Sequence, residues 1–123
     1  MMTIRVVERL EREAARKTID DARKKFGLNY VELSSALHVD RRTLLRYRKE
    51  ISTPLPGVRE RMERLREISQ LLDDLFDTPE TRTAWLHGSV PMLRGRRPID
   101  LMRQGELDDI LSVLADLYSG TFV

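Results

Sequence analysis

Residues 29–48, NYVELSSALHVDRRTLLRYR, carry the signals of two short helices. Asn29 begins a short helix, and Glu32 three residues later completes a pattern in which each side chain bonds the other residue's backbone amide. The segment HVD ends this helix, and Asp40 supplies the cap of a second helix over residues 41–49. The stretch therefore predicts two short helices joined by a tight turn.

The apolar residues of this stretch indicate which faces are buried. We expect Val31, Leu33, Ala36 and Leu37 to be buried on the first helix, Val39 in the turn, and Leu44 and Leu45 on the second helix. The outer positions of the second helix are then Arg41, Arg42, Thr43, Arg46 and Tyr47, with Arg48 and Lys49 at its end. The second helix is thus predicted to project a basic face from the surface.

This basic face has the chemistry needed to bind DNA. Five cations lie within nine residues. The major groove of DNA is about as wide as an α-helix, so the second helix could lie in it. Arginine can bond guanine O6 and N7 with two donors, while the other cations neutralise phosphates. We predict that the DNA contacts are Arg41, Arg42, Thr43, Arg46, Tyr47 and Lys49. The alternative is an ordinary solvated helix face.

Outside this stretch, nearly every segment has apolar residues at spacings of three and four, which predicts an all-α fold. Further helices are expected over residues 4–25, 58–76 and 98–103, and from 107 to a stop at Gly120. Thr78, with Pro79 at the first helical position, starts another short helix that includes Trp85 and Leu86. The first ten residues either fray or extend into a dimer contact.

The segment STPLPG predicts a boundary between two lobes, over residues 1–53 and 54–123. Residues 1–50 carry 13 Lys and Arg against 8 Asp and Glu, a net charge of +5, whereas residues 51–123 carry 9 against 12, a net charge of −3. Halves of opposite sign suggest two partners of different character. Ordinary solvated helix faces are the alternative.

The composition limits the cellular setting and the chemistry. The 123 residues include no cysteine, so disulfides and thiolate metal sites are excluded. Charges interrupt every apolar run, so we expect no membrane span and a cytoplasmic location. The two histidines, His38 and His87, lack the spacing of a zinc pair, and no catalytic or phosphate-binding motif is present. We therefore expect a protein that is not an enzyme and holds no metal or cofactor.

Residues 29–48 resemble the helix-turn-helix of the Xre/Cro repressor family. The residues that match its pattern are Glu32, Leu33, Thr43, Leu44, Arg46 and Tyr47. Two residues depart from it: His38 and Glu50 stand where glycine is common, and the Glu50 carboxylate would repel phosphate. Histidine tolerates a positive φ only moderately.

The C-terminal part resembles the toxin-binding domain of the MbcA/ParS/Xre antitoxin family. Its ordered pattern is matched by Trp85, Leu86, Pro91, Leu93, Gly95, Pro98, Leu101, Gly105, Ile110, Leu114 and Gly120. Together the two resemblances cover about residues 26–123. Whatever the function, Trp85, Leu86, Leu93, Leu101, Ile110 and Leu114 are expected in the core.

The resemblance implies an antitoxin that docks on a RES-domain toxin, an enzyme that consumes or transfers from NAD⁺, and closes its active site with the C-terminal end. The toxin contacts are then expected at Arg94, Arg96, Arg97, Tyr118, Gly120, Thr121, Phe122 and Val123. A solvated loop is the alternative for the three arginines. The resemblance also implies binding to the operator DNA of its own operon, by a homodimer because such operators are two-fold, and a hetero-oligomer with the toxin.

Four other interpretations remain open on the sequence. The chain could be a stand-alone Xre-type repressor whose C-terminal lobe only dimerises, or a helical adaptor without affinity for DNA. Thr121 and Val123 also satisfy a short C-terminal motif for peptide binders that add a strand. Finally, the tail could pack on its own helices or on a dimer mate.

Overall fold

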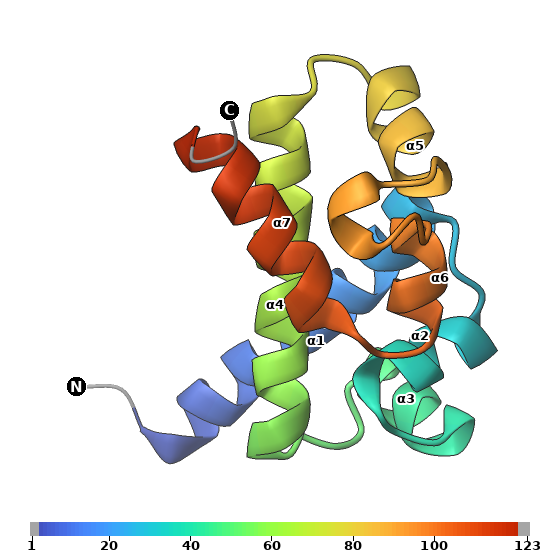
Figure 1. Ribbon diagram of the computed structural model, residues 1–123. Helices are drawn as coiled ribbons and strands as arrows, with labels where there is room; N and C mark the ends of the chain where they lie inside the picture. Colours follow the sequence, from blue (N-terminus) through green and yellow to red (C-terminus); the bar gives the residue numbers. More distant parts are fainter. Residues whose placement is uncertain (1–2, 121–123) are drawn as a thin grey trace.

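The computed structural model describes residues 3–120 and confirms the all-α fold (Figure 1). The helices are α1 (Ile4–Phe26), α2 (Tyr30–Leu37), α3 (Arg41–Arg48), α4 (Pro56–Leu75), α5 (Pro79–His87), α6 (Pro98–Arg103) and α7 (Leu107–Ser119), with a 3-10 turn η1 (Pro91–Leu93) between α5 and α6. No strand occurs within these described residues.

The predicted helix caps are confirmed. The Asn29 side chain accepts a hydrogen bond from the Glu32 backbone N–H at 2.8 Å, and the Glu32 carboxylate accepts one from the Asn29 N–H at 3.0 Å. Thr78 caps α5, with Pro79 at its first position. Gly120 ends α7 with a φ of 73°, the left-handed conformation that glycine adopts most readily.

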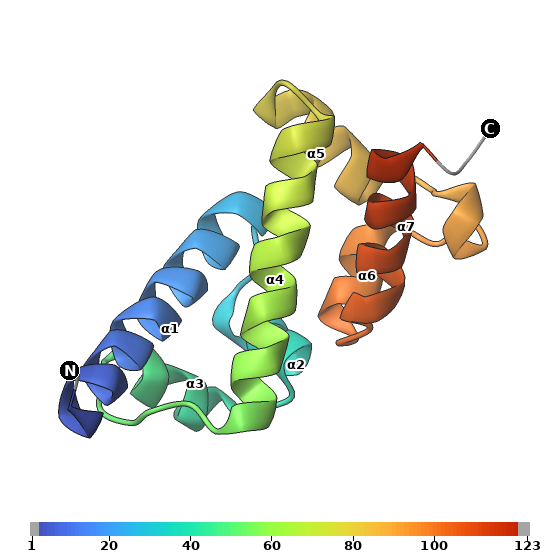
Figure 2. The ribbon, with the colours of Figure 1, turned by 90° about the vertical axis from the view of Figure 1, so that its left-hand side faces the viewer.

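Helix α4 is the central element, and α1 runs beside it in the same direction (Figure 2). Three contacts join residues that are 48 positions apart in the chain: Arg59 to Glu11 at 2.6 Å, Arg66 to Thr18 at 2.7 Å and Lys25 to Asp73 at 2.5 Å. Along each helix, successive partners are seven residues apart, close to two turns. The same two helix faces therefore stay in contact over four turns.

One hydrophobic core runs through both predicted lobes. Buried side chains from every helix belong to one cluster, including Ile19 of α1, Leu33 of α2, Leu44 of α3, Ile68 of α4 and Ile110 of α7. The boundary predicted after residue 53 falls in the loop between α3 and α4. The core continues across that loop.

The expectation that Val31 is buried is wrong, because its side chain is 60% exposed. At 100° per residue, Val31 points about 200° away from Leu33, which faces the core. Ser34 occupies a buried position instead, where its hydroxyl bonds the Tyr30 carbonyl oxygen at 2.6 Å. Leu45 is half-buried rather than buried.

The core residues expected in the C-terminal part are mostly confirmed. Leu86, Leu93, Leu101, Ile110 and Leu114 are buried. Trp85 is only partly buried and packs against the edge of the core, with its ring 6.0 Å from that of Phe76.

The two views agree on how the ends of the molecule are arranged. The N-terminal end of α1, helix α3 and the loop before α4 lie at one end, and the C-terminal end of α7 lies at the other (Figures 1 and 2). In the part of the chain that the structure describes, no helix is both long and apolar enough to pass through a bilayer.

Candidate functional sites

Helix α3 presents most of the predicted DNA contacts together. Arg41, Arg42, Arg46 and Lys49 are exposed around the half-buried Leu45. The helix begins at Asp40, whose carboxylate accepts a hydrogen bond from the Thr43 N–H at 2.6 Å. This backbone hydrogen bond is the main reason that the pKa of Asp40 lies below its ordinary value. We call Arg41, Arg42, Thr43, Arg46 and Lys49 the α3 face.

Tyr47 does not belong to this face. Its side chain is only 3% exposed and packs in the hydrophobic core, so the expectation that it contacts DNA is wrong. Tyr47 follows Leu44 by three residues, so the two side chains point only about 60° apart around the helix and both face inward. Arg48, at the end of the same helix, is held by the Asp20 carboxylate of α1 at 3.0 Å.

The two departures from the Xre pattern both occupy left-handed backbone conformations. His38 ends α2 with a φ of 57°, and Glu50 follows α3 with a φ of 59°. The Glu50 carboxylate lies 3.4 Å from the Arg16 guanidinium of α1. This pairing offsets the negative charge that would otherwise repel a phosphate near the end of α3.

A second set of contacts joins α2 to the turn between α6 and α7. Arg61 of α4 donates from Nε to the Ala36 carbonyl oxygen at 3.0 Å and from a terminal nitrogen to the Gly105 carbonyl oxygen. Burial lowers the pKa of the Arg61 guanidinium, which nonetheless stays charged near neutral pH. Arg103 of α6 adds an ion pair to Glu32 at 2.5 Å.

The contacts that Arg61 makes with α2 and the α6–α7 turn were not predicted, because an arginine beside the apolar stripe of an amphipathic helix carries no sequence signal of its own. The partners of Arg61 are backbone carbonyl oxygens, which every residue has. Only the folded arrangement brings the end of α2 and the α6–α7 turn within reach of one side chain.

The loop before α6 holds the three arginines predicted to contact a toxin. Arg97 makes a two-pronged contact with Asp100 at 2.8 and 2.9 Å, which raises the pKa of Arg97 and lowers that of Asp100. Arg96 donates to the Leu93 carbonyl oxygen at 2.9 Å and lies 3.4 Å from Glu106. Both side chains therefore help to shape the loop itself.

Arg94 is differently placed. It is exposed, has a φ of 60°, and makes no ion pair with any residue between 3 and 120. Beside it a shallow groove runs between the loop and α7, lined by Met92, Asp109 and Val113 among others. Of the three loop arginines, Arg94 has the side chain most available to a partner.

Two of the other predicted toxin contacts, Tyr118 and Gly120, lie at the end of α7. Tyr118 is 61% exposed, and Gly120 closes the helix. Thr121, Phe122 and Val123 lie outside the described residues.

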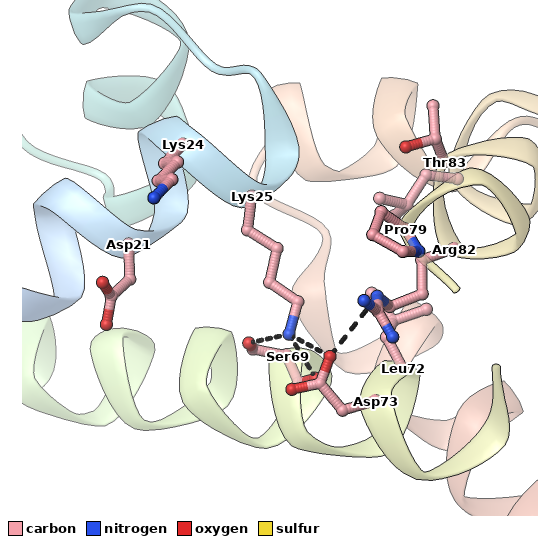
Figure 3. Close-up of a pocket in the computed structure, with 10 residues that line it drawn as sticks. Asp21, Lys24, Lys25, Ser69, Leu72, Asp73, Pro79, Arg82 and Thr83 are labelled. Atoms are coloured by element: carbon pink, nitrogen blue, oxygen red, sulfur yellow. Dashed lines mark hydrogen bonds and ion pairs between the residues drawn. The ribbon is translucent and has the colours of Figure 1, made fainter. Parts of the chain in front are cut away.

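A cleft between α1, α4 and α5 contains a network of charged side chains (Figure 3). Lys25 donates to the Ser69 hydroxyl at 2.7 Å and to Asp73 at 2.5 Å, and Arg82 lies 3.5 Å from the same Asp73 oxygen. The charges of these side chains pair with one another, and the contact between Arg82 and Asp73 links α5 to α4. Among the described residues, no three His, Asp or Glu side chains are arranged to hold a metal ion.

Comparison with known proteins identifies the family. The chain is 30% identical over 114 residues to the Mycobacterium tuberculosis protein named "Probable mycobacterial cidal antitoxin Rv3188". The aligned residues span 93% of this chain and 96% of that protein. The chain belongs to the MbcA/ParS/Xre antitoxin family. The family's "Antitoxin Xre/MbcA/ParS C-terminal toxin-binding domain" matches residues 71–120, from the last turns of α4 to the end of α7.

Other members of the MbcA/ParS/Xre family support this assignment. The mycobacterial cidal antitoxin MbcA, from Mycobacterium bovis and from Mycobacterium tuberculosis, is 24% identical over 106 residues, spanning 86% of this chain and 93% of that protein. The crystal structure of the M. tuberculosis MbcT–MbcA toxin–antitoxin complex contains a chain with a TM-score of 0.59 at 23% identity, covering 88% of this chain and 96% of that chain. At this identity the structure shows a shared fold.

Family membership makes this chain an antitoxin of a toxin–antitoxin system. The stand-alone repressor and the adaptor, both left open on the sequence, are therefore less well supported than an antitoxin.

Proposed function

We propose that this antitoxin neutralises a RES-domain, NAD⁺-consuming toxin by inserting residues 118–123 into the toxin's active site. The observation that carries the proposal is the position of the toxin-binding domain's last helix. Helix α7 ends at Gly120 at the end of the molecule opposite α3 (Figure 1), and Tyr118 in its last turn is 61% exposed.

The chemistry of the segment suits an enzyme pocket. Burying one large apolar side chain stabilises a complex by about 1.5–3 kcal/mol, and Tyr118, Phe122 and Val123 are apolar or aromatic. Arg94, on the adjoining loop, would contact the toxin beside that pocket.

We further propose that the α3 face binds the operator of the antitoxin's own operon. Its four exposed cations surround a short helix that is capped at its start and held at its end by α1. Because a two-fold operator presents two half-sites, two copies of the chain would bind it together.

The toxin proposal is tested by expressing the antitoxin with its toxin and measuring NAD⁺ turnover by the purified complex. A chain shortened to end at Thr121 should lose inhibition, whereas Lys17→Ala, which changes an exposed residue of α1, should inhibit like the unaltered chain. Full inhibition by the shortened chain would place the blocking surface elsewhere.

The operator proposal is tested by titrating the DNA upstream of the antitoxin gene at several salt concentrations. Arg42→Ala should weaken binding about tenfold or more and flatten the salt dependence, since each lost phosphate contact lowers the slope by about one. Lys24→Ala, which removes an exposed charge from α1, is the matched control. Equal binding by both variants would remove the α3 face from the site.

A further inference from the structure

Two apolar side chains lie within the basic surface of α3. Leu45 is half-buried, Ile51 in the loop after the helix is 59% exposed, and both line one shallow groove. The other side chains that line this groove are the cations Arg41, Arg42, Arg46 and Lys49. Core packing does not explain an exposed isoleucine among cations. We call Leu45 and Ile51 the α3 apolar pair.

The helical spacing places Leu45 on the outward side of α3. At 100° per residue, Arg41 and Arg46 mark the edges of an exposed arc of about 140°, and Leu45 lies about 40° inside the Arg41 edge. The buried side chains of Leu44 and Tyr47 lie outside this arc. Leu45 therefore faces the same side as the cations.

The backbone after α3 places Ile51 beside the last turns of the helix. Glu50 has a φ of 59°, its N–H bonds the Tyr47 carbonyl oxygen at 3.1 Å, and the Ile51 N–H bonds the Arg46 carbonyl oxygen at 3.0 Å. In a helix that ends with these two bonds, the residue after the left-handed one often contacts an apolar residue near the helix end. Leu45 occupies the matching position, and both side chains line the same groove.

Two contacts from α1 hold the loop that carries Ile51. The Arg16 guanidinium lies 3.4 Å from the Glu50 carboxylate, and Arg12 donates to the Thr53 hydroxyl at 3.1 Å. Ile51 lies between these two anchored residues. Its side chain therefore presents apolar surface at a fixed place beside α3.

The chemistry around the α3 apolar pair favours DNA as its partner. None of the four cations of the groove forms an ion pair within residues 3–120. An apolar protein surface placed over the groove would bury these cations without a counter-charge, which is unfavourable. Duplex DNA supplies phosphates for the cations, and the apolar group that its major groove displays is the C5 methyl of thymine.

We propose that the α3 apolar pair contacts the methyl group of thymine in the major groove, so that the operator half-site contains thymine beside α3. This inference rests on the proposed operator binding and adds a sequence preference to it. The cations of the groove respond to phosphates, which every sequence has, or to guanine. Leu45 and Ile51 respond to a methyl group that distinguishes thymine from the other bases.

The test compares two versions of the DNA upstream of the antitoxin gene that differ only in this methyl group. One version contains thymine and the other contains uracil, and the unaltered chain is titrated with each at the same salt concentration. Binding to the uracil DNA should be weaker by about fourfold or more, as expected when one methyl-sized group is no longer buried. Equal affinity for the two DNAs would overturn the inference and leave the operator proposal standing.

Variants of the α3 apolar pair show whether the preference comes from these side chains. Ile51→Ala, at an exposed position, should reduce the preference for thymine DNA, and the double variant Leu45→Ala with Ile51→Ala should bind both DNAs equally. Neither variant should change the salt dependence, since no charge is lost. Val31→Ala, at a 60% exposed apolar residue of α2, is the matched control and should keep the full preference.

The remaining outcomes separate the inference from the proposal on which it rests. Circular dichroism checks that the double variant keeps its helices, and Ile51→Ala alone decides the question if the double variant does not fold. A thymine preference that Ile51→Ala and the double variant keep unchanged would mean that uracil alters the DNA itself, and would overturn the inference. An unaltered chain that binds neither DNA would contradict the operator proposal and the inference together.

Discussion

Gly105 is a residue whose identity is imposed by its neighbours. It has a φ of 79°, and a methyl group at its Cα would lie 2.8 Å from Cδ2 of His38 and 3.0 Å from the Ser35 carbonyl oxygen. The turn between α6 and α7 approaches the end of α2 this closely because Arg61 donates to carbonyl oxygens on both. Glycine is thus required here by both backbone conformation and space.

Replacing this glycine should cost more stability than the backbone conformation alone explains. Gly27 offers the comparison, since its φ is 69° and nothing lies within 4 Å of an added methyl group. Gly27→Ala should lower the free energy of unfolding by about 1–2 kcal/mol, the cost of a left-handed residue with a Cβ. Gly105→Ala should lower it further. Urea denaturation measures both, and equal losses would mean that His38 and Ser35 yield without cost.

Residue by residue, the sequence predicted the features that depend only on near neighbours in the chain. The caps at Asn29, Asp40 and Thr78 are satisfied within three residues, so their patterns alone locate them. The angular positions of Val31 and Tyr47 relative to Leu33 and Leu44 also follow from the helical spacing, so the exposure of Val31 and the burial of Tyr47 were predictable locally. The contacts that Arg61 makes with Ala36 and Gly105 were not, because these partners are far away in the chain.

At the scale of elements, the stability of the start of α3 depends on the charge of the Asp40 carboxylate. The hydrogen bond from the Thr43 N–H lowers the pKa of Asp40 in the folded chain. A lowered pKa means that the cap adds stability above the unfolded pKa of about 4, and that this contribution is lost as the pH falls through the lower, folded value. Acidification should therefore weaken the start of the helix.

Asp40→Asn tests this prediction, because asparagine caps a helix about as well without a titrating group. The unaltered chain should lose more unfolding free energy than Asp40→Asn as the pH falls from 6 to 3, measured by urea denaturation at each pH. Asp77→Asn, in the loop before α5, provides the control. Parallel acid profiles for the unaltered chain and Asp40→Asn would contradict the role of the cap.

Asp73 of α4 links α5 to the body, because Lys25 of α1 and Arg82 of α5 both approach its carboxylate. Asp73→Ala should lower the free energy of unfolding by about 1 kcal/mol, as expected for a partly exposed network, and speed amide hydrogen exchange in α5. Asp74→Ala is the matched control, since Asp74 bonds only Gln70, at 3.0 Å, among the described residues. Similar exchange in both variants would show that apolar contacts alone hold α5.

At the scale of the whole molecule, the continuous core predicts a single unfolding transition. The one tryptophan, Trp85, lies in α5 beside Phe76 and reports on the C-terminal part, whereas circular dichroism reports on all helices. The two signals should change at the same urea concentration. A fluorescence transition displaced from the helical one would mean that the parts before and after residue 53 unfold separately.

The order of the helices was predictable from the sequence, and the junctions between them were not. Apolar spacing and capping residues gave each helix to within a few residues, including the interruption at Gly105. The parallel register of α1 and α4 rests on contacts such as Arg66 to Thr18, between residues 48 positions apart. Neither residue predicts that pairing, because arginine and threonine are common on any helix surface.

The separation of the two ends of the molecule has a consequence for how the antitoxin would respond to its toxin. Helix α4 alone, at 20 residues, is about 30 Å long, and the α3 face and the end of α7 share no residue. A toxin bound at one end would not displace an operator bound at the other. Repression would then follow the total amount of antitoxin in the cell, whether or not each copy is already occupied by toxin.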